Sequence, residues 1–446
     1  MANRTILLLA FMVALGASAP SPGQVATESE RTAPNAISGA QRDNLIAAIE
    51  AAIRQDYVFP EKSAAIVAGL EQARQQGRYD SSDAGALAQR ITEDLGTSSG
   101  DHHVYVNYDP KRYALAILPA DTGEGAGDSY DRSLSLRDNS GLTEMRILSG
   151  NIRYLKIARF GWIPDESGAA YDSAMRFMRG GDALIIDLRG NPGGDSAAVR
   201  YLVSHFLDPD TLEFSFLEGT KQPVQMRSLD YVPAGRLKGK PLYVLIDGGV
   251  ASAAESFAYD VQQFKLGDLV GAKTVGAANN NKFIPIAPGF MLSISYGRPV
   301  HAVSGSNWEG TGVAPSVAVT PGDALDTAQR LALLRLKDDK GASPEAIADY
   351  DWALIEVESR LHPPKLRSDR LRSLTGRYND IEVKLENGEL WMARANRPAR
   401  KLVPLTTDGL FSLDGIDMLR VRIKSDALET FWKGDPTPRS YPRQHG

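Results

Sequence analysis

The sequence has 446 residues, of which 43% are hydrophobic and 24% are charged, and its formal net charge at pH 7 is -5. These values are typical of globular proteins, and the length predicts roughly two to three domains of about 150 residues each. The acidic balance and the lack of a basic cluster argue against nucleic acid as a partner. Cysteine is absent, which excludes thiol catalysis, and the six histidines (102, 103, 205, 301, 362 and 445) form no spaced metal signature. We therefore expect no metal and no other cofactor.

The N-terminus predicts export. Arg4 supplies a positive charge, residues 6–15 form an apolar segment, and residues 16–19 (Gly-Ala-Ser-Ala) resemble a cleavage region, so a signal peptide is expected over residues 1–19. The apolar segment is short for a membrane span, and we expect no stable span after signal removal and a periplasmic or extracellular protein. An uncleaved anchor is the alternative. Residues 20–37 are rich in Ser, Pro, Thr and Glu and predict a flexible leader.

An N-terminal helical module is predicted over residues 38–100. Apolar residues recur there at helical spacing, and Pro60 is expected to end the first helix. Two further helices are expected at 64–76 and 83–95. Residues 109–150 are polar and Gly-rich with weak periodicity, which predicts strand pairs and loops.

Strands and helices alternate from Asn151 onward, which predicts an α/β core over residues 101–340. The expected strands are 152–157, 183–187, 212–217, 242–246 and 269–271, and the expected helices are 168–179, 196–206 and 251–263. Residues 282–286 and 291–295 flank Ala-Pro-Gly and predict a hairpin. Helices are expected at 324–337 and 343–360, and residues 341–368 form a helical linker that ends near Pro363-Pro364. Residues 369–446 contain Asn387-Gly388 and Asp414-Gly415 hairpin signals and predict a small all-β module.

Ser252 follows an apolar strand and a run of small residues, at the expected start of a helix. Free backbone N–H groups and the helix dipole can hold an oxyanion at such a position, which suits a nucleophile. Ser252-Ala253-Ala254-Glu255 also matches a capping box, in which the Ser and Glu side chains satisfy each other's backbone N–H groups. Taken alone, the four residues favour the cap.

Residues 187–194 (Asp-Leu-Arg-Gly-Asn-Pro-Gly-Gly) lie between a buried strand and a helix. Their glycines allow backbone N–H groups to form an oxyanion cradle, whereas a phosphate loop is excluded because the Lys-Ser/Thr ending is missing. A tight structural turn, with Arg189 paired to a carboxylate, is the better interpretation of this segment alone. His103 is the best candidate for a general base and Glu309 for the acid that orients it, although each is by itself commonly a solvated loop residue.

Taken in order, four motifs resemble those of the C-terminal processing and tricorn-core serine peptidases. They are Asp101-His102-His103, residues 187–194, residues 252–255 and residues 309–315, and the resemblance covers residues 38–336. The nearest branch is that of the interphotoreceptor retinoid-binding protein repeats. The resemblance implies a ClpP/crotonase-like layered α/β core, with Ser252 as nucleophile and oxyanion donors from Ala253 and from Gly193 or Gly194.

One motif departs from the processing-protease branch, which places a general-base Lys in Thr-Phe-Gly-Lys. This chain reads Thr-Val-Gly-Ala over residues 274–277. The tricorn-like branch uses His and Glu instead, so the resemblance implies a catalytic set of Ser252, His103 and Glu309. The expected function is an exported serine peptidase that cleaves peptides or proteins through an acyl-enzyme. Two alternatives are a binding protein for an apolar small molecule on the same scaffold, with little or no catalysis, and an exported scaffold whose β module binds a cell-envelope partner.

Overall fold

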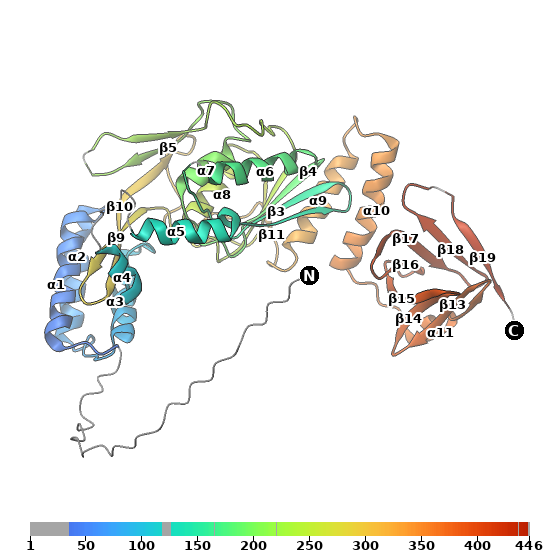
Figure 1. Cartoon of the computed structure of the whole chain (residues 1–446), viewed down its shortest axis with the longest axis horizontal. Coiled ribbons are helices and arrows are strands. Elements are labelled where there is room, and N and C mark those ends of the chain that lie inside the picture. Colours follow the sequence, from blue (N-terminus) through green and yellow to red (C-terminus); the bar gives the residue numbers. More distant parts are fainter. Residues whose placement is uncertain (1–34, 118–125, 165, 220, 436, 445–446) are drawn as a thin grey trace, which may run out of the picture.

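The computed structural model describes residues 35–117, 126–164, 166–219, 221–435 and 437–444. N-terminal helices, an α/β core and a C-terminal β-barrel follow one another along the chain (Figure 1). The fold class predicted from the sequence is therefore confirmed. The signal peptide and most of the leader lie outside the described residues. In the part of the chain that the structure describes, no helix is long and apolar enough to cross a bilayer.

Three helices form the N-terminal module. They are α1 (Gly39–Asp56), α2 (Pro60–Gln75) and α3 (Ala84–Ser99). The side chain of Ser38 caps α1 in a capping box with Gln41, and the side chain of Asp83 caps α3. Pro60 was expected to end the first helix; instead α1 ends at Asp56, and Pro60 starts α2 at a position where its missing N–H costs nothing.

Residues 109–150 differ from the prediction of strand pairs and loops. They form α4 (Pro110–Ala116), α5 (Ala126–Arg137), a 3-10 turn (Asn139–Gly141) and the single strand β2 (Leu142–Leu148). The prediction was wrong for the two helices. Helix α4 buries none of its residues, so it has no apolar stripe that a periodicity search could detect, and it is started by the Asp109 side chain and Pro110.

A six-stranded sheet lies at the centre of the core, in the order β11-β8-β7-β4-β3-β2. All its neighbouring strands are parallel except β2 and β3. Side chains of β4 and β7 alternate between two buried clusters, because α6, α7 and α8 cover one face and α9 and α10 the other. The bounds are β3 (Ile152–Ile157), α6 (Ser167–Arg179), β4 (Ala183–Asp187), α7 (Ser196–Val203), β7 (Leu242–Ile246), α8 (Ala253–Gln263), β8 (Asp268–Gly271), β11 (Val317–Ala318), α9 (Ala324–Lys337) and α10 (Pro344–Leu361).

A second, antiparallel sheet joins the N-terminal helices to the core. Its long strand β10 (Phe290–His301) pairs with β1 (Tyr105–Tyr108), with the hairpin partner β9 (Asn280–Ile286) and with β5 (Leu212–Leu217), and β5 pairs with β6 (Val224–Arg227). The predicted hairpin around Ala-Pro-Gly is confirmed. Because β1 directly follows the His103 turn, pairing with β10 brings that turn to the core.

The C-terminal module is an eight-stranded closed barrel preceded by α11 (Ser368–Ser373). Its strands are β12 (Gly376–Tyr378), β13 (Ile381–Glu386), β14 (Glu389–Arg394), β15 (Arg397–Pro404), β16 (Leu410–Leu413), β17 (Ile416–Ile423), β18 (Ala427–Trp432) and β19 (Arg439–Gln444). The all-β prediction is confirmed, and closure comes from the pairing of β12 with β19. The barrel contacts α10 through Trp352, which stacks on the guanidinium of Arg420, and through an ion pair of Asp349 with Lys433.

Candidate active site

Ser252 occupies a strained backbone conformation between β7 and α8. Its φ is +53° and its ψ is -123°, a region that residues with a side chain rarely adopt. Such conformations persist only where the surroundings hold them, and they are common at functional sites. Ser252 is half-buried and lines a cavity of about 250 Å³ together with Gly194, Ala253 and Asn279.

Glu255 holds this turn in place. The side chain is fully buried, and its Oε2 accepts hydrogen bonds from the backbone N–H groups of Ser252 (2.9 Å) and Ala277 (2.8 Å). Its Oε1 accepts from the Thr274 hydroxyl (2.5 Å) and the Gly276 N–H (2.6 Å). Burial raises the pKa of Glu255, while the four hydrogen bonds act to lower it. Glu255 therefore ties the serine turn to the segment where the processing-protease branch has its Lys.

The glycine-rich loop lies directly against the serine turn. A Cβ atom on Gly193, whose φ is +109°, would lie 2.8 Å from Ser252 Cβ and 2.9 Å from the Ala251 carbonyl oxygen, so only glycine fits there. The Gly193 N–H donates to Oδ1 of the buried Asn191 over 2.8 Å. Gly194 is exposed and lines the cavity with Ala253.

Arg189 pairs with the carboxylate of Asp187, two residues earlier, as the structural interpretation of this loop expected. Lys156 and the Tyr154 hydroxyl contact the same carboxylate. Burial acts to raise the pKa of Asp187, but the hydrogen bond from Arg189 and the charge of Lys156 outweigh it, so the pKa lies below its usual value. These contacts give Arg189 a structural role at the start of the loop.

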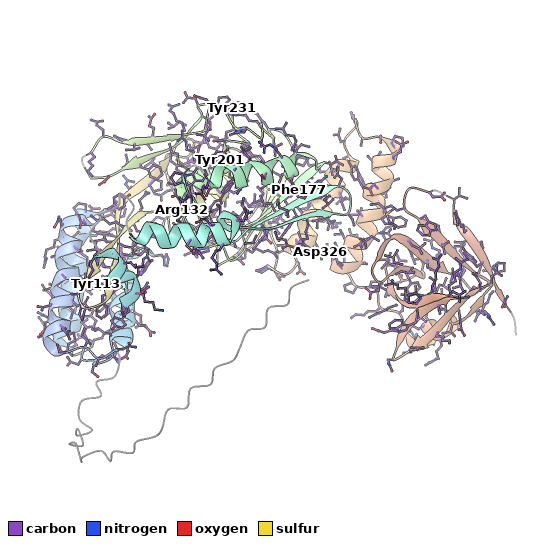
Figure 2. All side chains as sticks on the ribbon, in the orientation of Figure 1. Tyr113, Arg132, Phe177, Tyr201, Tyr231 and Asp326 are labelled. Atoms are coloured by element: carbon purple, nitrogen blue, oxygen red, sulfur yellow. The ribbon has the colours of Figure 1, made fainter. Side chains whose placement is uncertain are left out.

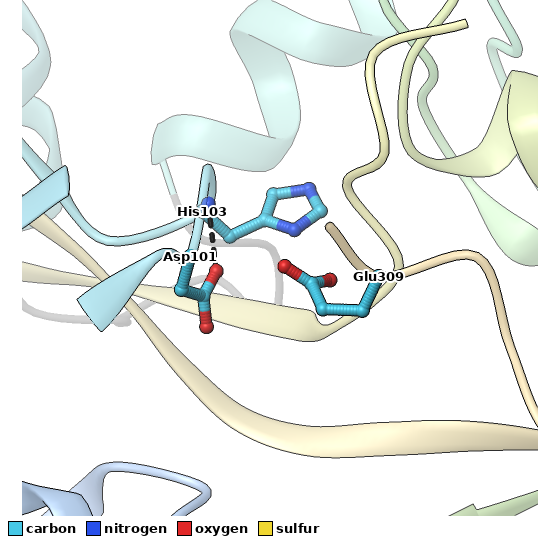
Figure 3. A group of neighbouring side chains, drawn as sticks. All are labelled: Asp101, His103 and Glu309. Atoms are coloured by element: carbon cyan, nitrogen blue, oxygen red, sulfur yellow. Dashed lines mark hydrogen bonds between the residues drawn. The ribbon is translucent and has the colours of Figure 1, made fainter. Parts of the chain in front are cut away.

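His103 and Glu309 are far apart in the sequence, and the fold brings their side chains close together (Figure 3). A ring nitrogen of His103 and one carboxylate oxygen each of Glu309 and Asp101 lie within 4.8 Å of one another. His103 Nδ1 and Glu309 Oε1 are both buried without a hydrogen-bond partner among the described residues. The other oxygen of Glu309 accepts from the backbone N–H groups of Ala278 (2.6 Å) and Asn279 (2.9 Å), which fixes the carboxylate beside the ring.

Two residues of this site were not assigned from the sequence. Oδ1 of Asp101 accepts from the His103 backbone N–H (2.9 Å), and its Oδ2 accepts from the side-chain amide of Asn279 (3.0 Å). Asp101 belongs to a motif that the sequence offered, so its proximity to His103 was a usable signal. Asn279 stands in no motif, and only the fold places it beside Asp101.

The electrostatics of the site act in opposite directions on the His and the Glu. Burial, reinforced by the charge of Asp101, raises the pKa of Glu309 to about 7. Burial lowers the pKa of His103 below its usual value, although the charge of Asp101 opposes this shift. A neutral imidazole next to a carboxyl that titrates near neutrality is suited to proton transfer.

In the described part of the chain, these three residues form a group whose potential ligand atoms are close enough together to bind a metal ion. Both Asp101 oxygens, however, already accept hydrogen bonds, from His103 and Asn279.

Asn279 lines the serine cavity together with Ser252, and its side-chain amide donates to Asp101, the residue that accepts from the His103 backbone N–H. Among the residues with defined positions, no hydrogen bond joins Ser252 to His103. At Ala277, where the processing branch has its Lys, the side chain is 3% exposed and the carbonyl accepts from the Trp308 indole.

A larger cavity of about 660 Å³ adjoins the serine cavity, because both are lined by Gly194 and Asp195. Its walls include Trp162, Phe283 and Arg132, which lies on α5 (Figure 2). The two cavities adjoin at Gly194 and Asp195, and their walls include both apolar and charged side chains.

Two family models match this chain. The model of peptidase family S41 matches residues 151–319, and the model of the N-terminal domain of peptidase S41 in eukaryotic IRBP matches residues 39–125. The two models thus match separate parts of the chain, one in the N-terminal helices and one in the α/β core. The resemblance to S41 peptidases predicted from the motifs is confirmed.

Particular relatives match part of the chain. A carboxy-terminal-processing protease of Bartonella bacilliformis is 27% identical over 220 residues, which are 48% of this chain and 45% of that protein. A putative tricorn protease homolog 2 of Streptomyces coelicolor is 29% identical over 219 residues, 44% of this chain and 18% of that protein. The chain thus spans less than half the length of these relatives. A lipoprotein structure from Streptococcus agalactiae has a TM-score of 0.47 and 17% identity, and covers 67% of this chain and 98% of that one.

Proposed function

We propose that this protein is an exported serine peptidase with Ser252 as nucleophile, His103 as general base and Glu309 as the acid that orients it. The observation that carries the proposal is the proximity of His103 and Glu309, whose Nδ1 and Oε1 atoms are both buried and have no hydrogen-bond partner among the described residues. An unpartnered buried nitrogen and oxygen are costly unless they serve each other or a function. A carboxylate that accepts from Nδ1–H leaves Nε2 free to take a proton from a serine.

The oxyanion donors in this proposal are the backbone N–H groups of Gly194 and Ala253. Both residues line the serine cavity, and Ala253 begins α8, so its N–H is one of the helix donors without an intrahelical partner. Gly193 was the other candidate from the sequence. Its N–H donates to Asn191, which favours Gly194 for the role.

The reaction follows from these positions. Oγ of Ser252 attacks the carbonyl carbon of the substrate peptide while His103 Nε2 takes the Oγ proton, and the oxyanion accepts hydrogen bonds from Gly194 and Ala253. The C–N bond then breaks, and the leaving amine takes the proton from His103. A water molecule, deprotonated by His103, attacks the ester carbon and releases the acid product, and Ser252 Oγ recovers its proton.

The substrate class is a peptide or protein segment. The larger cavity, which adjoins the serine cavity at Gly194 and Asp195, offers the apolar walls of Trp162 and Phe283 for substrate side chains beyond the reacting bond. Backbone pairing of Phe160 with Gly194 lies at this junction.

The test is labelling of the full chain by a fluorophosphonate probe, with the labelled serine identified by mass spectrometry. We expect label on Ser252 and loss of label and of peptide cleavage in Ser252→Ala. The matched control is Ser256→Ala, because Ser256 lines the same cavity one helical turn later. We expect His103→Gln and Glu309→Gln to lower cleavage by about 10³ to 10⁴-fold. Equal cleavage by Ser252→Ala and wild type would overturn the assignment.

Two controls separate this proposal from other functions. A metal chelator should leave cleavage unchanged; its loss would assign Asp101, His103 and Glu309 to a metal instead. A chain that takes no label and cleaves no member of a diverse peptide library would favour the binding protein.

Export is part of the proposal and is motivated by Arg4, the apolar residues 6–15 and the small residues 16–19. Expression of the full chain in a bacterial host, followed by cell fractionation and N-terminal sequencing, tests it. A mature chain in the periplasm that starts shortly after residue 19 is expected. A full-length chain confined to the cytoplasm would contradict export.

A further inference from the structure

The C-terminal barrel has a cavity of about 380 Å³ at one end. Residues at the ends of β14 and β18 and at the starts of β15, β17 and β19 line it, so it opens at the end of the barrel where these strands turn. The remaining interior is filled by a buried apolar cluster, and Leu371 of α11 packs against that cluster. An eight-stranded barrel is just wide enough to be filled by its own side chains or to hold one small ligand.

The floor and walls of this cavity are apolar. They are formed by Ile381, Met392, Leu413, Ile416, Leu419 and Trp432. Trp432 is 40% exposed, which is unusual for so large an apolar side chain. The floor continues the sealed barrel core, because Ile381 and Leu413 belong to both.

Four arginines line the same cavity, and its lining contains no carboxylate. Arg394 forms an ion pair with Asp380 (2.6 Å). For Arg397, Arg400 and Arg439 the described residues offer no ion pair and no side-chain hydrogen bond. The mouth thus presents unpaired guanidinium groups above an apolar floor, and guanidinium groups bind carboxylates in bidentate fashion.

A buried hydroxyl also supports the binding of an anion at this mouth. Thr430 is 5% exposed, lines the cavity, and its Oγ1 has no hydrogen-bond partner among the described residues. Thr430 lies directly opposite Arg439 in the antiparallel pair β18–β19, so their side chains share one face of the sheet. An anionic oxygen held by Arg439 would also accept from this hydroxyl, which would satisfy a group that is otherwise costly to bury.

We propose that the barrel mouth binds a small amphipathic anion of the medium-chain carboxylate class. The aliphatic chain lies on the floor formed by Met392 and Leu419, and the carboxylate accepts hydrogen bonds from Arg439, Arg400 and the Thr430 hydroxyl. The cavity volume lies near the lower limit of about 300 to 1,000 Å³ for small-molecule sites, which favours one such molecule over a polypeptide segment. This site is separate from Ser252 and does not depend on the proposed peptidase activity.

The experiment is a calorimetric titration of the full chain with dodecanoate below its micellar concentration, with Trp fluorescence as a second readout. We expect saturable binding of one molecule per chain. Binding should weaken at least tenfold in the double variant Arg400→Gln, Arg439→Gln and severalfold in Thr430→Val. The matched control is Arg377→Gln, an exposed arginine on β12 outside the cavity, which should bind as wild type does. Ser252→Ala should also bind dodecanoate unchanged.

Two further arms test the chemistry on wild-type protein, so the result does not depend on a variant that folds poorly. Dodecyltrimethylammonium has the same tail and the opposite charge and should not compete. A peptide with an apolar C-terminal residue and a free carboxylate should compete weakly or not at all. Absence of saturable binding, equal binding of the cationic amphiphile, tighter binding of the peptide, or unchanged affinity in a folded double variant would each overturn the proposal.

Discussion

The backbone N–H of Ser252 donates a 2.9 Å hydrogen bond to Oε2 of Glu255, a side chain with no exposed surface. The sequence offered two interpretations of these residues, a helix cap and a nucleophile. The Glu255 carboxylate accepts the hydrogen bond from the Ser252 N–H that a capping box requires. It also accepts hydrogen bonds from residues of the segment 274–277. The cap therefore holds Ser252 in its strained conformation, and the two interpretations are compatible.

Glu255→Gln should destabilise the fold by about 2 to 4 kcal/mol, because the amide nitrogen replaces an oxygen that accepts from two N–H donors and leaves both unsatisfied in the interior. Peptide cleavage should fall with it, since the Ser252 turn loses its anchor. Urea unfolding monitored by circular dichroism measures the stability. The control is Glu218→Gln, an exposed partner of Lys221, for which a change below about 1 kcal/mol is expected. Similar unfolding curves for the two variants would contradict this role of Glu255.

Periodicity predicted the elements that bury an apolar face. Strands β4 and β7 at the centre of the sheet are apolar runs, and α9 spans residues 324–337 as expected, because these elements carry their packing in their own sequence. Helix α4 has no buried residue and was missed. Closure of the barrel depends on the pairing of β12 with β19, strands about sixty residues apart, and local sequence carries no signal for that contact.

The candidate site could be predicted in parts. The motif order pointed to Ser252, His103 and Glu309 because each motif has its own residue signature. The proximity of Asn279 to Asp101 arises only when the segment after Gly276 folds back to the turn before β1, and the bond from the Gly193 N–H to Asn191 is a detail of one loop conformation. Neither contact follows from spacing along the chain.

Gly193→Ala should reduce cleavage by about 10²-fold or more, because a methyl group there would displace Ser252 Cβ or the Ala251 carbonyl. Gly190→Ala is the matched control. Gly190 also has a positive φ (+72°), but a Cβ there would meet no heavy atom within 4 Å. Gly190→Ala should therefore lose about 1 to 2 kcal/mol from backbone strain in thermal unfolding, and Gly193→Ala should lose more because of its steric clash; only Gly193→Ala should lose activity. Equal activities would show that the close approach of the two loops is unimportant.

The pH dependence of kcat/KM should report Glu309. In the proposed role this carboxyl must be ionised to accept from His103, so activity should rise as pH increases through about 7, the pKa to which burial and Asp101 raise it. Asp101→Asn removes the neighbouring charge and should move this rise to lower pH. Rotation of the Asn279 amide can accommodate the new side chain, since its Oδ1 accepts no hydrogen bond from the residues that the structure describes. Glu71→Gln, at a half-buried residue of α2 that pairs with Arg54, should leave the profile in place. An unmoved profile in Asp101→Asn would contradict the assignment.

A second group of buried ionisable side chains lies in the core at the other end of β10. Nε2 of His301 lies 3.2 Å from Oδ1 of Asp260, and both side chains, like Glu213, are fully buried. His301 Nδ1 accepts from the Val303 N–H, which places the ring proton on Nε2, facing Asp260. Burial lowers the pKa of His301 to about 4, and burial together with the charge of Asp260 raises that of Glu213 to about 9.

These shifts predict how stability changes with pH. Above its usual pKa of 4.5, Glu213 is ionised in the unfolded chain but keeps its proton in the native state up to about pH 9. The native state then binds more protons, so this group's contribution falls as pH rises from about 5 to 9, by at most about 1.4 kcal/mol per pH unit. Glu213→Gln removes this dependence. Between pH 6 and pH 8.5, the unfolding free energy of Glu213→Gln should therefore increase relative to that of wild type. The unfolding free energy of Glu218→Gln should change with pH in the same way as that of wild type. Parallel curves for Glu213→Gln would show that Glu213 is ionised in the native core.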